Sequence, residues 1–360
     1  MTSKIAVIGA GNGGFAMSTD LGLAGFNVNL FEFPEYAENI KPLEKDGSIT
    51  ATGEARAGTY IPQMITSDIQ KAIEGVEAVL VAVQAPAHEK LAHLLGKHMK
   101  PNQLVFLFPG YASSISMNKI WKEQYSLMDV KCAEVMTLPY ACRKTSPNSV
   151  HVFRRTGKLG IAAFPGKYLD EMYGFFKKIY PDSYEFGNIL EVAFCNQNLL
   201  VHPTITLLNA GRIETAKGNF DFYADGCTAS VEKLIDSLDQ EILAVFKKLG
   251  FTNTSSKQVC EIRFGMSWKK LQDERKSWKI TGLDTLDTRY VTEDVPTGLI
   301  FLSSIAKQYS VACPTCDALI HLWQVISGEN FWEYGRTMER LGLDKFSIQE
   351  LVEFLHNGSI

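Results

Sequence analysis

Hydrophobic and polar positions follow two different patterns along this chain of 360 residues. In the first half, short apolar runs rich in β-branched residues recur between helical stretches, which is typical of a parallel sheet with crossover helices. The predicted strands lie at residues 5–9, 28–32, 76–83, 103–108 and 132–136. The pattern therefore predicts an α/β fold that begins with a Rossmann-type domain, whose sheet is mostly parallel.

Two other stretches of the first half also have an extended pattern. GSITATGEARAGTYIP at 47–62 predicts a β-hairpin, and VHVFRR with KLGIAAF, within 150–164, predicts a second pair of strands at the edge of the sheet.

Apolar positions follow a helical period from residue 188 to residue 355, with a break rich in helix breakers at 281–298. The pattern changes at 180–188. We therefore expect a dinucleotide-binding domain over residues 1–185 and an all-helical, substrate-binding C-terminal domain over residues 186–360.

A narrow polar stripe interrupts an apolar stretch in the second half, NQNLLVHPTITLLNAGR at 196–212. At helical spacing one face carries Asn198, His202, Ile205, Asn209 and Arg212. A wide apolar surround with a narrow polar stripe is the reverse of an ordinary surface helix, so the stripe indicates a wet cleft. Pro203 removes an N–H, so the helix should kink there or begin again at the histidine. On this segment alone, a packing role for His202 is the commoner alternative to catalysis.

Composition narrows the classes of function. With 46% hydrophobic and 21% charged residues, the chain has the make-up of a folded globular protein. A net charge of −4, without a dominant basic face, argues against a nucleic-acid partner. No apolar run approaches membrane-spanning length, and the first residues enter a strand-and-glycine pattern at once. We therefore expect a cytoplasmic protein with no membrane partner; a homodimer is left open.

Cysteine and histidine spacing does not predict a metal site. Seven scattered cysteines fit a reducing compartment. Cys313 and Cys316 have CxxC spacing at an expected helix start, and we favour two packing thiols over a redox pair. His88, His93 and His98 recur every five residues, which scatters them around a helix.

A glycine-rich turn at residues 9–14, GAGNGG, lies between the first predicted strand and a helical stretch. Gly9 permits the tight turn, Gly11 allows the backbone to approach a pyrophosphate, and Gly14 allows close packing of helix on strand. The expected cofactor-binding residues are Gly9, Gly11, Asn12, Gly13, Gly14, Glu32 and Pro86. A glycine turn without a ligand is the alternative.

Glu32 ends the second predicted strand, where a carboxylate would accept hydrogen bonds from the adenosine ribose hydroxyls. No arginine or lysine follows it directly, so repulsion of a 2′-phosphate should favour NAD over NADP. Pro86 follows the third predicted strand, at the sheet edge where open parallel sheets bind ligands.

Four segments together resemble the opine dehydrogenase family: GAGNGG, the NxxxHP element at 198–203, the LLNAGRIE that follows it, and LDTRYVTEDVPTGL at 286–299. The resemblance spans nearly the whole chain. It implies a nucleotide-binding domain followed by a helical domain. It also implies NAD(P)H-dependent reductive condensation of an amino acid with a 2-oxo acid such as pyruvate, through an imine.

The same resemblance implies roles for particular residues. His202 would be the catalytic acid/base, Asp294 would pair with it and fix its tautomer, and Arg289 would bind a substrate carboxylate. PYACR at 139–143 resembles the family's cleft-lining turn, which adds Cys142 and Arg143 as substrate-binding residues. Asn198, one helical turn before His202, is added as a polar group on the same face.

Other interpretations stay open on the residues alone. Asp294 could cap a helix, and Arg289 could form a structural ion pair. A ketopantoate reductase-like enzyme would use a lysine near the start of the corresponding helix, and no lysine occurs between Asn188 and Asn209. A non-enzymatic regulator that senses NADH would not need His202, Asp294 and Arg289 together.

Overall fold

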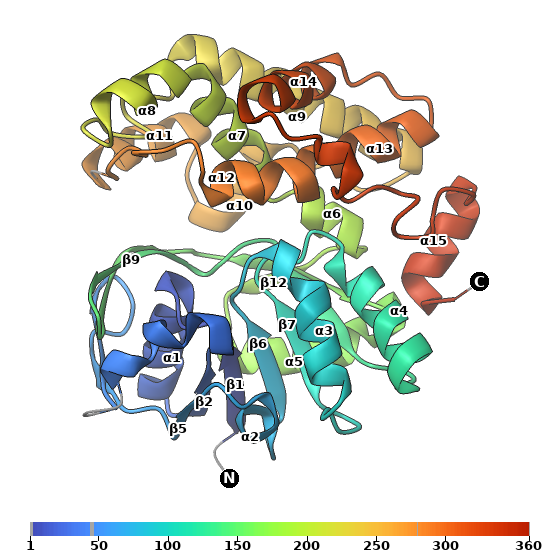
Figure 1. Cartoon of the computed structure of the whole chain (residues 1–360). Helices are drawn as coiled ribbons and strands as arrows, with labels where there is room; N and C mark the ends of the chain where they lie inside the picture. The colour runs from blue at the N-terminus through green and yellow to red at the C-terminus, as the bar shows by residue number, and fades with distance from the viewer. Residues whose placement is uncertain (1–2, 44–46, 279, 360) are drawn as a thin grey trace. The chain divides into compact units, whose positions relative to one another are not determined.

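A computed structural model describes residues 3–43, 47–278 and 280–359 of the chain. The chain divides into two compact units, Met1–Ile189 with Leu355–Gly358, and Leu190–Phe354 with Ser359–Ile360. The first is an α/β unit and the second is helical, as the sequence pattern predicts (Figure 1). The domain limits of 1–185 and 186–360 stay a prediction.

The α/β unit is built on one large sheet. Within the described residues the strand order is β12-β11-β8-β7-β6-β1-β2-β5, and neighbouring strands run parallel except at β11–β8. The strands are β1 (Lys4–Ile8), β2 (Asn27–Phe31), β5 (Met64–Thr66), β6 (Ala78–Val81), β7 (Leu104–Leu107), β8 (Cys132–Val135), β11 (Leu159–Phe164) and β12 (Ser183–Glu185). The helices of this unit are α1 (Asn12–Leu23), α2 (Ile69–Ile73), α3 (His88–Gly96), α4 (Ser113–Tyr125) and α5 (Leu169–Ile179).

The central strands β6 and β7 are apolar and buried at every position, because both faces of the sheet are covered. Along β1, Ile5 and Val7 pack into one hydrophobic cluster, whereas Ala6 and Ile8 pack into the other. Successive side chains of a strand point to opposite faces, so a doubly covered strand needs an unbroken apolar run. This is why five short apolar runs sufficed to predict five of the strands.

A smaller sheet, in the order β4-β3-β10-β9, accompanies the large one. Its strands are β3 (Ile49–Gly53), β4 (Gly58–Tyr60), β9 (Tyr140–Ser146) and β10 (Ser149–Arg155). The antiparallel β3–β4 pair confirms the hairpin predicted at 47–62.

The strand pair predicted within 150–164 is wrong. β10 pairs with β9 and with β3 in the small sheet, whereas β11 joins β8 and β12 in the large one. Burial explains the separation: all six residues of β11 are buried, as a doubly covered strand requires, whereas β10 has only two buried residues, at alternate positions, as a strand covered on one face does. The predicted turn at 139–143 is also wrong, since Cys142 and Arg143 lie in strand β9.

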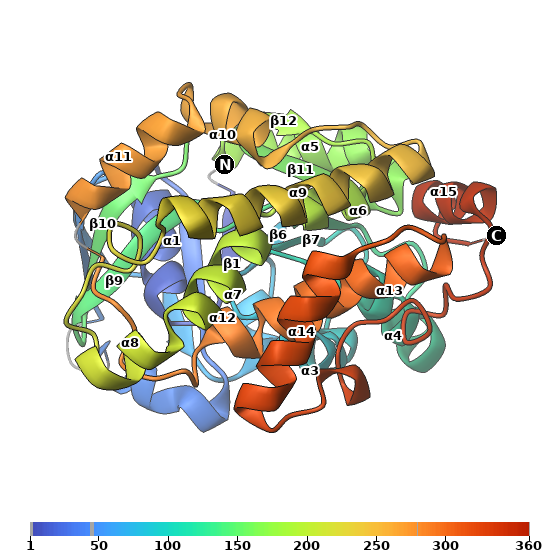
Figure 2. The same ribbon diagram turned by 90° about the horizontal axis from the view of Figure 1, so that it is seen from above.

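The helical unit is arranged around α7. In this unit α9 and α14 both pack on α7, and Figure 2 shows the long α9 crossing it. The described helices are α6 (Ile189–Phe194), α7 (Asn198–Leu208), α8 (Ala210–Ala216), α9 (Ala229–Leu249), α10 (Ser256–Phe264), α11 (Trp268–Trp278), α12 (Arg289–Thr292), α13 (Ile300–Gln308) and α14 (Pro314–Ser327). Near the C-terminus, α15 covers Ile348–Asn357.

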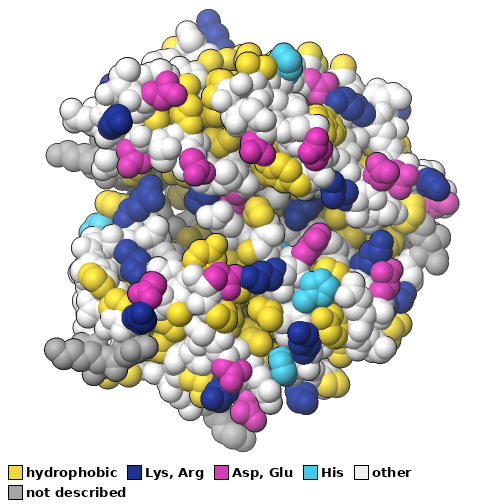
Figure 3. Space-filling view, in the orientation of Figure 1, with side chains coloured by type: hydrophobic (Ala, Val, Ile, Leu, Met, Phe, Trp, Pro, Cys, Tyr) yellow, Lys and Arg dark blue, Asp and Glu magenta, His cyan; other side chains and the backbone are white. Residues whose placement is uncertain are grey.

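The distribution of charged side chains on the surface agrees with the small net charge of the chain. On the face drawn in Figure 3, Lys and Arg side chains are interspersed with Asp and Glu side chains over both units. In the part of the chain that the structure describes, no helix combines the length and the apolar character needed to cross a membrane.

Candidate active site

The glycine-rich turn connects β1 to α1 and has the geometry of a dinucleotide-binding loop. Gly9 has φ +102°, a conformation that favours glycine. A Cβ on Gly14 would lie 1.6 Å from the carbonyl oxygen of Gly9, so only glycine fits there. Gly11, the N-cap of α1, differs, because a Cβ there would meet nothing within 4 Å. Space beside Gly11 and an α1 first turn without acidic residues fit an anionic pyrophosphate.

Glu32 lies directly after β2, and its buried carboxylate is tied to the glycine-rich turn. Its Oε2 accepts from the Ala10 N–H at 3.0 Å and from the Asn39 side chain at 3.0 Å, and its Oε1 accepts from the Phe33 N–H at 2.9 Å. The hydrogen bond from Ala10 therefore fixes the end of the second strand beside the glycine-rich turn. This is where a dinucleotide-binding fold holds the adenosine ribose.

Strand β9 supplies neighbours of this loop that are far away in sequence. The Lys144 N–H donates to the side chain of Asn12 at 2.8 Å, and the Lys144 ammonium lies 3.8 Å from the centre of the Phe15 ring. Just before β9, Leu138 packs on Gly13, where an added Cβ would lie 2.7 Å from the Leu138 side chain. The sequence alone gave no indication of Lys144, because its proximity to the loop arises only when the small sheet forms.

Three other predicted residues of this unit lie in strand β9 and in the turn after β6. Cys142 is partly exposed and Arg143 is exposed on β9, and Pro86 is exposed in a 3₁₀ turn that follows β6. The predicted roles of Cys142, Arg143 and Pro86 stay predictions.

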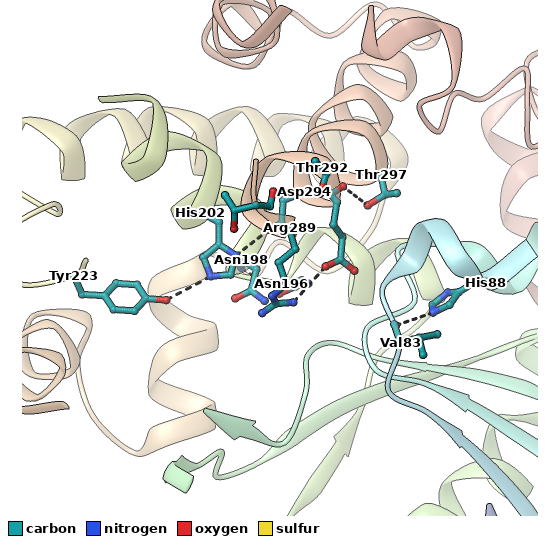
Figure 4. Close-up of polar contacts among 12 residues, drawn as sticks. Val83, His88, Asn196, Asn198, His202, Tyr223, Arg289, Thr292, Asp294 and Thr297 are labelled. Carbon is teal, nitrogen blue, oxygen red and sulfur yellow. Dashed lines mark hydrogen bonds and ion pairs between the residues drawn. The ribbon is translucent and has the colours of Figure 1, made fainter. Parts of the chain in front are cut away.

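The helical unit brings His202 and Asp294 together, as expected (Figure 4). His202 Nδ1 lies 2.8 Å from Asp294 Oδ2, and both side chains are buried, at 4% and 2% exposure. A carboxylate can only accept, so Nδ1 carries the proton and Nε2 is left as the acceptor of the neutral ring. Asp294 makes no helix-capping hydrogen bond, which removes the capping interpretation.

His202 and Asp294 are held by two different helical segments. His202 lies in the middle of α7, a single helix with Pro203 inside it. Of the two alternatives expected at Pro203, a new helix start at the histidine is therefore wrong, and a kink stays a prediction. Asp294 precedes a π-helical turn, Val295–Leu299, of the kind that often occurs at functional sites. The break between helices that we predicted at 281–298 ends earlier in the structure, because Arg289–Thr292 already form a helix.

The polar stripe of α7 divides into two parts. Asn209 ends the helix and donates to the carbonyl groups of Ile205 and Gly226, while Arg212 lies in α8 and pairs with Asp225. These two residues stabilise local structure. Asn198 is partly exposed one turn before His202, at the start of α7, and its substrate-binding role stays a prediction.

Aromatic rings enclose the imidazole, and the sequence pattern missed them. Tyr290 stacks on His202 with ring centres 3.7 Å apart and planes at 15°. The Tyr223 hydroxyl lies 3.4 Å from Nε2, and the Arg275 guanidinium lies over the Tyr223 ring, 4.7 Å from its centre. Tyr223 comes from the loop after α8, which no local signal connects to His202.

Burial lowers the pKa of His202 below its ordinary value. The hydrogen bond and the charge of Asp294 raise this pKa, and the positive charges of Arg289 and Arg275 lower it. The imidazole is therefore neutral near pH 7 in the ligand-free protein and is ready to accept a proton at Nε2.

Arg289 lies near enough to influence His202 electrostatically, and it also forms an ion pair. Its Nη1 lies 3.3 Å from Oε2 of Glu293, whose side chain is only 1% exposed, while Arg289 itself is 43% exposed. The structural ion pair considered from the sequence is therefore present. The exposed side of this guanidinium is accessible to a substrate, and a guanidinium binds a carboxylate through two parallel hydrogen bonds.

The two cysteines with CxxC spacing are not among the residues that contact His202 in the described structure. Cys313 and Cys316 are buried free thiols at the start of α14, and the Cys316 Sγ–H donates to the Leu299 carbonyl group. Burial raises the pKa of Cys313 to about 12 and that of Cys316 well above its ordinary value. Such thiols are inert, which favours the packing role.

Comparison with known proteins identifies the family. A family model described as the α-helical domain of NAD/NADP octopine/nopaline dehydrogenase matches residues 185–327, and one for the N-terminus of NAD-dependent glycerol-3-phosphate dehydrogenase matches residues 4–120. An opine dehydrogenase from Arthrobacter sp. (strain 1C) is 31% identical over 343 residues, which are 94% of each chain. The chain belongs to the opine dehydrogenase family. It is thus an NAD(P)-dependent oxidoreductase that acts on CH–NH groups.

Less similar members of the family also match over most of the chain. Octopine dehydrogenase from Mizuhopecten yessoensis is 25% identical over 369 residues, with 89% of each chain covered. The structure of octopine dehydrogenase with NADH and L-arginine has a TM-score of 0.77 and 20% identity, covering 100% of this chain and 99% of that one. A ketopantoate reductase from Ralstonia eutropha is less similar, with a TM-score of 0.58 and 17% identity.

Proposed function

We propose that this opine dehydrogenase uses His202 as the acid/base in the reductive condensation of an amino acid with a 2-oxo acid, with NADH as the preferred cofactor. The observation that carries the proposal is the buried pair of His202 and Asp294, with Nε2 turned to Tyr223 instead of to the carboxylate. A histidine that only packs would not need a buried carboxylate partner of this geometry.

The residues of the glycine-rich turn and Glu32 would hold the cofactor. Bound NADH supplies a hydride. The N–H groups at the start of α1 would face the pyrophosphate, and the Glu32 carboxylate would accept from the ribose hydroxyls. Glu32 would also repel a 2′-phosphate, which supports NADH over NADPH. The balanced reaction joins amine, 2-oxo acid, NADH and one proton, and yields a secondary amine, NAD⁺ and water.

His202 would move the protons that this chemistry requires. The amine attacks the carbonyl carbon, and the resulting carbinolamine loses water only after its hydroxyl group receives a proton. Protonated His202 can donate this proton from Nε2, while Asp294 holds the ring at Nδ1 and stabilises the imidazolium. In the reverse oxidation, neutral His202 accepts a proton from the secondary amine or from the attacking water.

Two carboxylates must be bound in such a reaction, one from each organic substrate. Arg289 is suited to one of them, because a guanidinium binds a carboxylate through two parallel hydrogen bonds. By resemblance to the family, Arg143, Cys142 and Asn198 are further substrate-binding residues. Structures of octopine dehydrogenase hold NADH with L-arginine and NADH with pyruvate, which supports this class of substrates.

The direct test is a screen of amino acids against pyruvate, glyoxylate and oxaloacetate, with NADH absorbance as the readout and a secondary amine as the product to be identified by mass spectrometry. We expect NADH oxidation that requires both an amino acid and a 2-oxo acid. Consumption of ketopantoate alone, without an amine, would replace the proposal with the reductase alternative. NADH binding without turnover on any pair would favour the regulator.

A further inference from the structure

Lys144 occupies an electrostatically unusual position. Its backbone is held to Asn12, the first residue of α1, and its ammonium lies over the ring of Phe15 in the same helical turn. The N-terminus of a helix carries a partial positive charge, so a cation there is repelled instead of attracted. Desolvation lowers the pKa of Lys144, and the charge of Glu32 raises it. The surroundings therefore disfavour the charge unless an anion is near.

Glu32 compensates only part of this positive potential. The charge of the Glu32 carboxylate acts on Lys144, but this carboxylate already accepts hydrogen bonds from the Ala10 N–H in the glycine-rich turn, from the Phe33 N–H and from the Asn39 side chain. Next to them lies the open space beside Gly11. A site with a helix N-terminus, a half-buried ammonium and room for a ligand suits a phosphate group.

We propose that Lys144 is a phosphate-binding residue of the cofactor site, supplied by the small sheet. This inference rests on the proposed function only in placing the dinucleotide at the glycine-rich turn. The phosphate is either the pyrophosphate, which NADH and NADPH share, or the 2′-phosphate, which only NADPH carries. In both cases a charge-assisted hydrogen bond to the ammonium would offset the repulsion at the helix N-terminus.

The variant that tests this role is Lys144→Met, which keeps an unbranched side chain over Phe15 and removes the charge. Dissociation constants for NADH, NADPH and adenosine should be measured by titration calorimetry in the absence of substrates. Removal of one charged donor should weaken NADH or NADPH binding about 10- to 100-fold. Adenosine, which has no phosphate, should bind the variant and the parent protein alike.

Two further variants serve as controls. Lys144→Arg keeps the charge and should retain most of the dinucleotide affinity. Lys177→Met removes another lysine that lies over an aromatic ring, 4.5 Å from the centre of Tyr173 on α5, and should change no affinity. Equal losses for NADH and NADPH would assign the pyrophosphate, and a larger loss for NADPH would assign the 2′-phosphate.

Unchanged affinity for both dinucleotides in Lys144→Met would overturn the inference. An equal loss for adenosine would also overturn it, because the lysine would then only shape the loop. Since binding is measured without substrates, failure of the condensation reaction would leave this result unaffected. If the parent protein itself did not bind NADH, that result would instead refute the cofactor site on which both proposals rest.

Discussion

The glycine-rich turn and the histidine site are built in opposite ways. The turn is contiguous in sequence, and its geometry is dictated by backbone that approaches backbone, as at Gly14 and Gly9. The histidine site combines α7, the loop that holds Tyr223, and the segment from Arg289 to Asp294. Binding of a constant cofactor can be encoded by a short local motif, whereas acid/base chemistry needs side chains that only tertiary packing assembles.

The largest expected effect of a substitution is at Gly14. In Gly14→Ala the added Cβ would overlap the carbonyl oxygen of Gly9, which is backbone and cannot rotate away. We expect a loss of more than about 3 kcal/mol in the free energy of unfolding, with loss of NADH binding. Thermal and urea unfolding would measure it. Unaltered stability would show that the turn is less constrained than its geometry indicates.

Gly11→Ala should separate cofactor approach from folding in the same turn. Its Cβ meets no protein atom within 4 Å, so stability should change little. The methyl group would instead occupy the space in which backbone approaches the pyrophosphate, and NADH affinity should fall about 100-fold.

Gly174→Ala is the matched control, because Gly174 on α5 also has open space around its Cβ position. NADH affinity should be unchanged in that variant. Equal affinity in Gly11→Ala and Gly174→Ala would contradict the cofactor assignment of the turn.

Asp294→Asn should lower turnover about 10- to 100-fold without a change in NADH affinity, because the neutral amide stabilises the imidazolium less and no longer fixes the tautomer. The charge of Asp294 raises the pKa of His202, so its removal should lower that pKa further. In the oxidative direction neutral His202 is required, so activity rises with pH through its pKa. The acid limb of kcat/KM should therefore move to lower pH, and a shift to higher pH would be inconsistent with the assigned pair.

The smallest of these effects concerns Glu32. Glu32→Gln removes the charge that would face a 2′-phosphate and keeps the size of the side chain, so the preference for NADH over NADPH should fall about 10-fold. Ratios of kcat/KM for the two cofactors would measure it. Glu35→Gln is the control, since Glu35 is an exposed residue that pairs with Lys90. Comparable efficiency with both cofactors in the parent enzyme would refute this interpretation of Glu32.

How much the sequence predicts depends on whether the signal is local. The GAGNGG turn and the five central strands follow from short patterns, and helical periodicity leads to His202. The contrast between the alternating β10 and the uniformly apolar β11 was also visible in the sequence, but proximity along the chain suggested a pair. Strand pairing depends on which strands the whole fold brings together, and β10 pairs with β3, which lies almost 100 residues earlier in the sequence.

The remaining parts of the candidate sites had no local signal. Nothing in the sequence distinguishes Tyr223 and Tyr290 from other aromatic residues. In the fold, the Tyr223 hydroxyl lies at Nε2 of His202, and Tyr290 stacks on the imidazole ring. Lys144 reaches the glycine-rich turn only through the small sheet. Asp294 was found by resemblance to a family, since its spacing from Pro296 predicts a helix cap equally well.

The most direct test of the acid/base role of His202 is to measure turnover and NADH affinity together in His202→Ala. We predict turnover lower by roughly 100-fold or more, with NADH affinity within about twofold of the parent enzyme. His88→Ala, which removes a buried histidine hydrogen-bonded to the Val83 carbonyl group in the α/β unit, should lower stability and leave turnover per folded molecule unchanged. Near-normal turnover in His202→Ala, with unfolding at a lower temperature, would contradict the assignment and make His202 a packing residue.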